Sequence, residues 1–81
     1  QQARTDHLSG LLNRLSISEI IDYELLRFKR SQKPFALIMG DVDYFKKIND
    51  SAGHLAGDQV IKDIAALINN SLREQDSAAR W

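Results

Sequence analysis

The apolar stretch that ends in two aspartates limits the possible folds more than any other part of this chain. An unbroken apolar run from Phe35 to Met39 stops at Gly40 and is followed by Asp41 and Asp43. A short apolar run bounded by glycine and acids is typical of a buried central strand. Side chains at i and i+2 lean to the same side of a strand, so we expect the two carboxylates together at the mouth of a sheet. A divalent cation and a phosphate ligand could sit there.

Length and composition limit the classes of function. The chain has 81 residues, of which 43% are apolar, and this predicts one small globular domain rather than a disordered segment. Eleven basic residues balance eleven acidic ones, which argues against binding to a nucleic-acid polymer. No apolar run reaches the roughly 20 residues that span a bilayer, so we expect no direct membrane contact in this segment. The absence of cysteine fits a cytoplasmic location, although the parent protein could be membrane-anchored.

A first amphipathic helix is predicted upstream of the apolar run. Ser16 or Ser18 is expected to cap its N-terminus. The helix should end near Lys29 and Arg30, because cations suit the negative end of the helix dipole. Its apolar face recurs at steps of four, four and three: Ile17, Ile21, Leu25 and Phe28.

A short helix and a second long helix are predicted downstream. The short one spans Tyr44 to Asp50 and is broken by Gly53, and the long one opens near Leu55 and runs to about Leu72. Residues 77–81 should begin another strand. The order of these elements predicts an α/β (α+β) fold with a βαβ-type core: a helix, a strand, a short helix, a long helix and the start of a strand. Since one strand and the start of another cannot close a sheet, we expect an incomplete folding unit.

The acidic pair admits two metal-binding interpretations that the surrounding residues do not support. The order Asp41-Val42-Asp43 begins like an EF-hand calcium loop, but position six would be Lys46 and position twelve Ala52. That loop needs a glycine and a bidentate glutamate at those positions. The D-x-D of a nucleotide-sugar transferase has the same spacing, but nothing else in this short chain supports such an enzyme.

Four groups of residues carry a more specific similarity. Residues 5–14 read T-D-x-L-S-G-L-x-N-R, residues 41–50 read D-x-D-x-F-K-x-I-N-D, and residues 53–58 read G-H-x-x-G-D. Residues 73–81, R-E-Q-D-S-A-A-R-W, follow. In this order and spacing the chain resembles the N-terminal half of the GGDEF family, the diguanylate cyclases. The family's Gly-Gly-Asp/Glu-Glu-Phe signature would begin after Trp81, so we expect residues 1–81 to be the N-terminal portion of one such domain, with residues 1–14 as a leading turn and junction to an upstream segment.

The resemblance implies a fold and a reaction. The fold would be part of a ferredoxin-like, nucleotide-cyclase-like core. The reaction would condense two GTP molecules into cyclic di-GMP, with Mg²⁺ or Mn²⁺ as cofactor. One GTP would be held by each of two facing domains in a homodimer, and cyclic di-GMP would be the product and a candidate inhibitor.

The resemblance also implies roles for the acidic stretch and the residues after it. Asp41 would bind the metal through its carboxylate and Val42 through its backbone carbonyl, with Asp43 as a further candidate ligand. Phe45 and Lys46 would lie along the GTP phosphates, and Asp41 and Lys46 would be the catalytic residues. Metal ions and a cation neutralise the triphosphate and align the attacking hydroxyl.

Two further pairs are implied as ligand-binding residues. Asn49 and Asp58 would read guanine, because a carboxylate accepts hydrogen bonds from the base and an amide serves its remaining atoms. Arg73 and Asp76 form an R-x-x-D placed like the family's inhibitory site, where cyclic di-GMP binds.

Each role has a structural alternative. Asp43 could instead cap the short helix. Asp58 could instead be an acid in the first turn of the long helix, where the helix dipole stabilises a negative charge. The R-x-x-D could instead be an exposed end of that helix. His54 fits a turn residue. Asn13 and Arg14 fit structural roles that tie the leading turn to the body of the domain. Asp6 fits a cap or the junction with an upstream helix.

The sequence therefore predicts the N-terminal half of a diguanylate cyclase domain. The alternative is a degenerate GGDEF domain that binds GTP, cyclic di-GMP or a protein partner without catalysis. In both cases we expect these 81 residues alone to be inactive.

Overall fold

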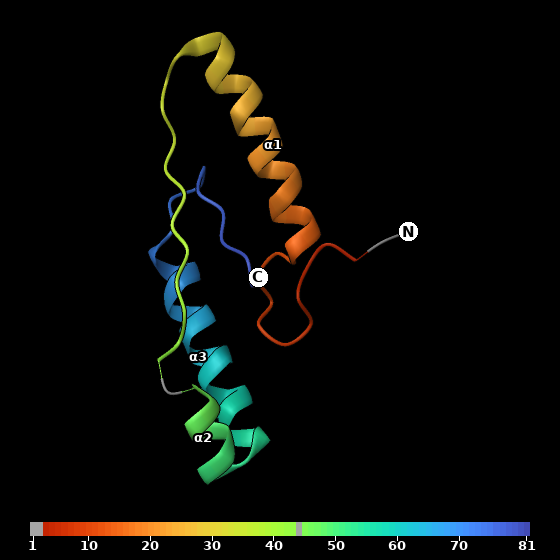
Figure 1. Cartoon of the computed structure of the whole chain (residues 1–81), viewed down its shortest axis with the longest axis vertical. Coiled ribbons are helices and arrows are strands. Elements are labelled where there is room, and N and C mark those ends of the chain that lie inside the picture. The colour runs from red at the N-terminus through yellow and green to blue at the C-terminus, as the bar shows by residue number, and fades with distance from the viewer. Residues whose placement is uncertain (1–2, 44) are drawn as a thin grey trace.

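The computed structural model describes residues 3–43 and 45–81, in which three helices are joined by extended segments (Figure 1). The helices are α1 (Arg14–Ser31), α2 (Phe45–Ala52) and α3 (His54–Ser71). The radius of gyration is 15.0 Å, whereas a compact domain of this length has about 12 Å. The described chain is therefore elongated.

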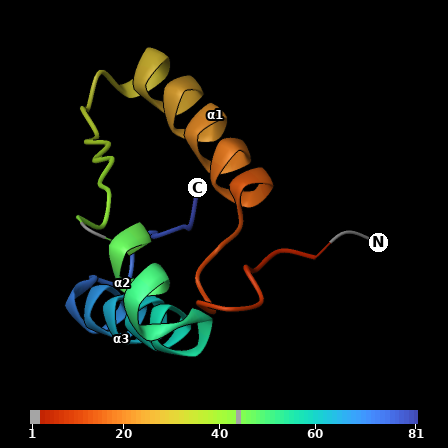
Figure 2. The same ribbon diagram turned by 60° about the horizontal axis from the view of Figure 1, so that its bottom comes forward.

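Helices α2 and α3 form a packed pair. Of the described helices, only these two contact each other, and α2 lies across the beginning of α3 (Figure 2). Gly53 turns the chain between them with φ 89°, a conformation that favours glycine. The predicted short helix and its break at Gly53 are confirmed, apart from Tyr44, which lies outside the described residues. The long helix begins at His54, close to its predicted start.

The cap of α1 differs from the prediction. The N-cap is Asn13, whose Oδ1 accepts a hydrogen bond from the backbone N–H of Ser16 at 2.9 Å. Ser16 lies inside the first turn, and its Oγ donates to the carbonyl of Arg4 at 2.8 Å. The assignment of Ser16 or Ser18 as cap was wrong because a distant segment of the chain engages the Ser16 hydroxyl.

The apolar run from Phe35 to Met39 is not a buried strand in this structure. It belongs to an extended segment between α1 and α2, with Ile38 89% exposed and Met39 71% exposed. A strand needs neighbours for its backbone N–H and C=O groups, and no described segment forms a ladder with this run. The prediction of a buried strand is therefore wrong for this chain. The described residues form no βαβ core.

Backbone pairing occurs elsewhere, where the leading turn meets the C-terminal segment. Leu12 forms an antiparallel bridge with Thr5 and a parallel bridge with Ala79. The N–H of Leu12 donates to the carbonyl of Ala78 at 3.2 Å, and the N–H of Arg80 donates to the carbonyl of Leu12 at 2.9 Å. The predicted start of a strand at residues 77–81 is present only as an extended segment with one isolated bridge at Ala79, because a single neighbouring residue pairs with it.

The helices leave large apolar side chains exposed. Only Leu11 and Ala65 are buried apolar residues in the described part of the chain. None of the described helices combines the length and the apolar character needed to cross a membrane. The exposed side chains of the helices include the following: Leu15, Tyr23, Leu25, Leu26 and Leu67.

Candidate functional site

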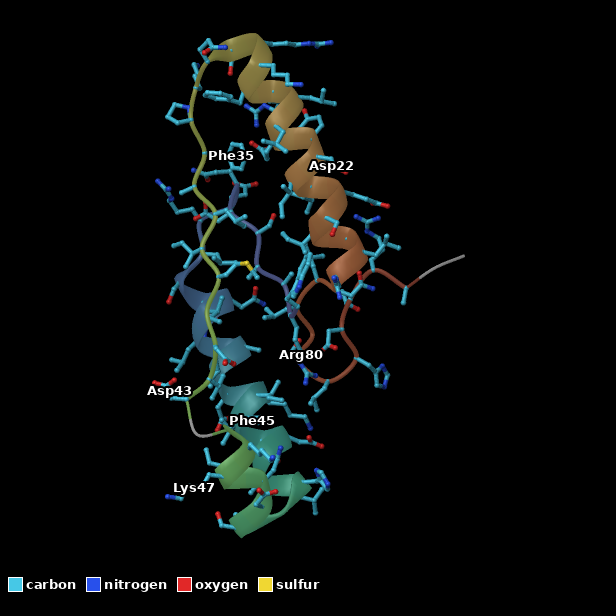
Figure 3. All side chains as sticks on the ribbon, viewed as in Figure 1. Asp22, Phe35, Asp43, Phe45, Lys47 and Arg80 are labelled. Carbon is cyan, nitrogen blue, oxygen red and sulfur yellow. The ribbon has the colours of Figure 1, made fainter. Side chains whose placement is uncertain are left out.

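The predicted metal ligands form a local turn before α2. Asp41 Oδ1 accepts a hydrogen bond from the N–H of Val42 at 2.9 Å, and the Val42 carbonyl accepts a long one, 3.4 Å, from the N–H of Phe45. Asp41 and Asp43 are exposed, and Asp43 lies at the bend that leads into α2 (Figure 3). Within residues 3–43 and 45–81, no group of three or more His, Cys, Asp or Glu side chains is arranged to hold a metal ion. The turn therefore offers carboxylate oxygens without a third acidic side chain beside them.

The predicted phosphate-binding residues open α2. Phe45 is the first residue of this helix and is half-buried, and the next residue, Lys46, is exposed. The first turn of a helix carries a partial positive charge and unpaired backbone N–H groups. An ammonium group at the same end makes this turn suitable for an anion.

The two predicted guanine-reading residues lie on the two helices that pack together, Asn49 on α2 and Asp58 on α3. The Asn49 side chain lies directly against Gly57, so close that a Cβ at position 57 would collide with its amide oxygen. Gly57 is buried, and Asp58 follows it, half-buried, on α3. Asn49 Oδ1 is a buried atom with no hydrogen-bond partner in the described residues. The helix pair thus brings the amide of Asn49 to the backbone of the residue that precedes Asp58.

Arg73 and Asp76 form a closed turn just after α3. Asp76 Oδ2 accepts hydrogen bonds from the backbone N–H of Arg73 at 3.0 Å and from its Nε at 3.4 Å, and the N–H of Asp76 donates to the Arg73 carbonyl at 3.0 Å. The backbone N–H of Arg73, helped by its guanidinium, holds the pKa of Asp76 below its ordinary value. Both residues are exposed. The structure therefore brings the predicted inhibitory pair together, with the two side chains engaged with each other.

A hollow lies beside this turn, between α3 and the leading turn. Its volume is about 210 Å³, and its walls include Leu11, Leu72, Asp76 and Ala78. Pockets that enclose drug-sized ligands have roughly 300–1,000 Å³. A dinucleotide at the turn would therefore lie largely outside the hollow.

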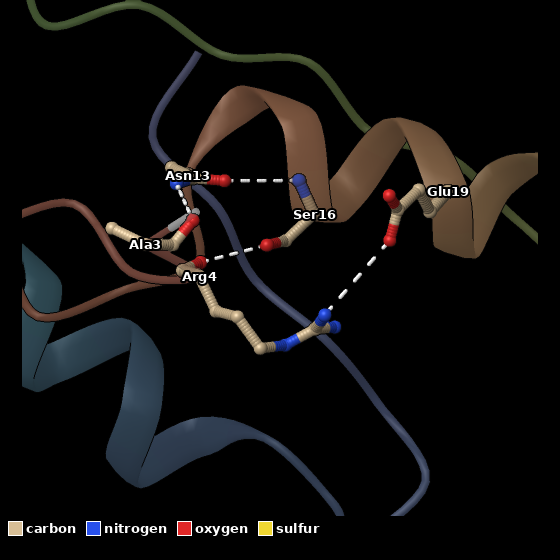
Figure 4. A network of polar contacts seen from close by, with 5 residues as sticks. All are labelled: Ala3, Arg4, Asn13, Ser16 and Glu19. Atoms are coloured by element: carbon tan, nitrogen blue, oxygen red, sulfur yellow. Dashed lines mark hydrogen bonds and ion pairs between the residues drawn. The ribbon is translucent and has the colours of Figure 1, made fainter. Parts of the chain in front are cut away.

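The leading turn is held to the start of α1 by a polar network (Figure 4). Asn13 Nδ2 donates to the carbonyl of Ala3 at 2.8 Å, while Asn13 Oδ1 caps the helix. The carbonyl of Arg4 accepts from both the Ser16 hydroxyl and the backbone N–H of Asn13. The ion pair between Arg4 and Glu19 is long, 3.9 Å, and exposed, so it adds little. The structural interpretation of Asn13 at this junction is confirmed.

Two side-chain contacts add to the backbone pairing of the C-terminal segment with the leading turn and the start of α1, and neither could be predicted from sequence spacing. Arg80 lies toward the leading turn (Figure 3), and its Nη1 is 3.4 Å from Asp6 Oδ2. The Arg14 guanidinium lies 4.5 Å from the centroid of the Trp81 ring. The hydrogen bond from the backbone N–H of Ser9 is the main cause that lowers the pKa of Asp6. Partial burial opposes it, and the Ser9 hydroxyl and the Arg80 guanidinium add smaller lowering effects. Asp6 therefore joins the leading turn to the C-terminal segment, whereas its role at a junction with an upstream helix stays a prediction.

Comparison with known proteins identifies one family. The family model described as "Diguanylate cyclase, GGDEF domain" matches residues 3–81. The chain is 46% identical over 81 residues to diguanylate cyclase DgcP of Pseudomonas aeruginosa, with all of this chain and 12% of that protein covered. It is 41% identical over 81 residues to cyclic di-GMP phosphodiesterase NbdA of the same species, covering all of this chain and 10% of that protein. It is 40% identical over 79 residues to diguanylate cyclase DgcS of Shewanella oneidensis, covering 98% of this chain and 27% of that protein.

Two solved structures from Caulobacter crescentus have the same arrangement. One is a sensory box/GGDEF family protein, 37% identical, with a TM-score of 0.90 over 96% of this chain and 50% of that one. The other is the GGDEF domain of DgcB in complex with c-di-GMP, 30% identical, with a TM-score of 0.83 over 99% of this chain and 47% of that one. The chain thus spans about half of each solved chain and a smaller share of the curated relatives.

Proposed function

This chain belongs to the GGDEF family of diguanylate cyclase domains, and on that premise we propose that the complete protein condenses two GTP molecules into cyclic di-GMP. One GTP would be bound by each of two facing domains of a homodimer. The observation that carries the proposal is the junction of α2 and α3, where Asn49 lies against the residue that precedes Asp58. An amide and a carboxylate at one junction supply the acceptors and the donor that the edge of guanine requires.

The acidic turn fits a hard divalent cation. Mg²⁺ is usually bound through one or two carboxylates together with substrate phosphates and water, and Asp41 and Asp43 are exposed carboxylates one residue apart. The residues that would hold Mg²⁺ or Mn²⁺ are Asp41, the carbonyl of Val42 and, as a further ligand, Asp43. When bound, the metal ion neutralises the triphosphate and activates the attacking 3′-hydroxyl.

The start of α2 would orient the triphosphate. Lys46 supplies a point charge on an exposed side chain, and the first backbone N–H groups of the helix add donors. Phe45 would pack along the phosphates and help to keep water away from them. In phosphoryl transfer the protein acts mainly by positioning and by electrostatic stabilisation, and these residues would supply both.

Product inhibition is proposed for Arg73 and Asp76. The arginine offers a planar fork to a phosphate or to guanine, and the aspartate accepts from guanine nitrogens. Because each side chain now engages the other, a bound cyclic di-GMP would compete with part of that pairing or bind beside the pair.

A second candidate function is a GGDEF domain that binds GTP or cyclic di-GMP without catalysis. One observation favours keeping it: a relative that matches the whole chain at 41% identity is named a phosphodiesterase rather than a cyclase. Membership in the family therefore leaves the reaction of the complete protein to experiment.

Incubating the complete protein with GTP and Mg²⁺, followed by chromatography for cyclic di-GMP, separates the two candidates. We expect product from the wild type and at least about 100-fold less from Asp41→Asn, because removal of a charged ligand strips transition-state stabilisation of several kcal/mol. The matched control is Asp22→Asn, an exposed acid on α1 that has no proposed role. GTP binding without product would favour the binding module, and undiminished turnover by Asp41→Asn would remove Asp41 from the mechanism.

A further inference from the structure

We infer that Gly57 is a positioning residue for substrate recognition: its missing side chain makes the space in which Asn49 holds its amide for guanine. The inference rests on the proposed function, in which Asn49 reads the base. It adds a residue with no ligand contact of its own, whose effect passes entirely through Asn49.

The need for glycine at position 57 comes from packing and not from the backbone. Of the four glycines in the chain, Gly10 and Gly53 have positive φ, and a Cβ at Gly10, Gly40 or Gly53 would meet nothing within 4 Å. Gly57 has an ordinary helical backbone in the first turns of α3, and its N–H donates to the carbonyl of Gly53 at 3.2 Å. At Gly57, therefore, a neighbouring side chain occupies the space that a Cβ would need.

The neighbour in question is the amide of Asn49. A Cβ at Gly57 would collide with Asn49 Oδ1 and would lie 2.7 Å from Cγ and 3.3 Å from Nδ2. All three atoms belong to the end of one flexible side chain. A methyl group at position 57 would therefore displace the amide and leave the backbones of α2 and α3 in place. Alanine is also the better helix former, so the fold should tolerate the change.

The amide that Gly57 accommodates lacks a partner. Among the buried side-chain oxygen and nitrogen atoms of the described residues, Asn49 Oδ1 is the one that has no hydrogen-bond partner. A buried acceptor without a donor is unfavourable, so such an atom in a native structure points to a ligand or another function. The χ2 torsion of asparagine is soft, so an amide with space at Gly57 can adjust its orientation to the base atoms that the carboxylate of Asp58 does not engage.

The test compares Gly57→Ala, Asn49→Ala and the double variant in the complete protein. We expect Gly57→Ala to raise KM for GTP roughly 3- to 10-fold, the range that corresponds to one neutral hydrogen bond. Its kcat at saturating GTP should stay unchanged, because the base is remote from the reacting atoms and the lost interaction is uniform binding. Its melting temperature should equal or exceed that of the wild type. Gly40→Ala, at a glycine with open space around it, serves as the matched control for a glycine substitution.

The double variant decides whether Gly57 acts through Asn49. We expect Asn49→Ala to raise KM, and Gly57→Ala to add nothing in that background, because the clash is then gone. Normal KM in Gly57→Ala, with KM raised in Asn49→Ala, overturns the inference and leaves the proposed function standing. Unchanged KM in Asn49→Ala overturns the inference and the assignment of Asn49 to guanine, whereas the proposed reaction itself fails only if the wild type forms no cyclic di-GMP. Loss of folding in Gly57→Ala, or additive effects in the double variant, would show that Gly57 has another role and would also overturn it.

Discussion

Replacement of Asn13 by alanine should destabilise the domain by about 1.5 kcal/mol. This free energy is the sum of the contributions of two hydrogen bonds seen in the structure. The side chain makes two hydrogen bonds, one from the backbone N–H of Ser16 at 2.9 Å and one to the carbonyl of Ala3 at 2.8 Å. Loss of an N-cap costs about 1 kcal/mol. The second bond is exposed and lies at the low end of the usual range, about 0.5 kcal/mol.

Serine at the same position separates the two parts. A serine hydroxyl can accept the hydrogen bond from the N–H of Ser16, but it is too short to reach Ala3. Since serine and asparagine are comparable caps, we expect Asn13→Ser to regain about 1 kcal/mol of the loss.

Urea unfolding of the complete domain measures the difference. With a slope of roughly 1–3 kcal/mol/M, a loss of about 1.5 kcal/mol lowers the midpoint by roughly 0.5–1.5 M at constant slope. Equal destabilisation by Asn13→Ser and Asn13→Ala would refute the assignment of Asn13 as the cap. An unchanged midpoint for Asn13→Ala would refute the importance of the whole network.

Further predictions concern inhibition, pH and the isolated chain. In the complete protein, Arg73→Ala should relieve inhibition by cyclic di-GMP without lowering the initial rate. Titration of cyclic di-GMP against the wild type and the variant measures this. Identical inhibition curves would mean that the Arg73–Asp76 turn has no regulatory role. The pKa of Asp6 is depressed below its ordinary value of 3.8 in the folded chain. Its contribution to stability should therefore be full above about pH 4 and be lost as the pH falls through the lower folded pKa. Thermal unfolding of Asp6→Asn between pH 2 and 7 should show the largest deficit at neutral pH, and a pH-independent deficit would contradict the assignment. The 81 residues alone should form no cyclic di-GMP from GTP and Mg²⁺, and turnover above a no-protein control would contradict our assignment of Asp41 as one part of a larger metal site.

The division between α1 and the α2–α3 pair matters for function. Residues proposed to contact GTP lie on α2, on α3 and in the turn before α2, whereas the leading turn and the C-terminal segment meet at the start of α1. The Arg73–Asp76 turn lies between these regions, directly ahead of the residues that pair with Leu12.

The sequence by itself determined the helices. Their positions follow from the 3.6-residue periodicity of apolar residues and from the break at Gly53, and both signals are local. The Arg73–Asp76 turn is local as well, because its hydrogen bonds span three residues. The order of the motif residues was sufficient to identify the family, which the comparisons then confirmed.

Only the tertiary structure decided how distant segments pair. The Ser16 hydroxyl was predicted as a helix cap but donates to Arg4, and Arg80 reaches Asp6 across 74 residues of chain. Neither partner can be read from spacing, because a hydrogen bond between remote segments depends on how the whole chain folds. The same reason explains the run Phe35–Met39: its composition suits a strand, but a strand forms only where other segments satisfy its backbone groups. The contact between Asn49 and Gly57 likewise arises only because α2 packs against α3.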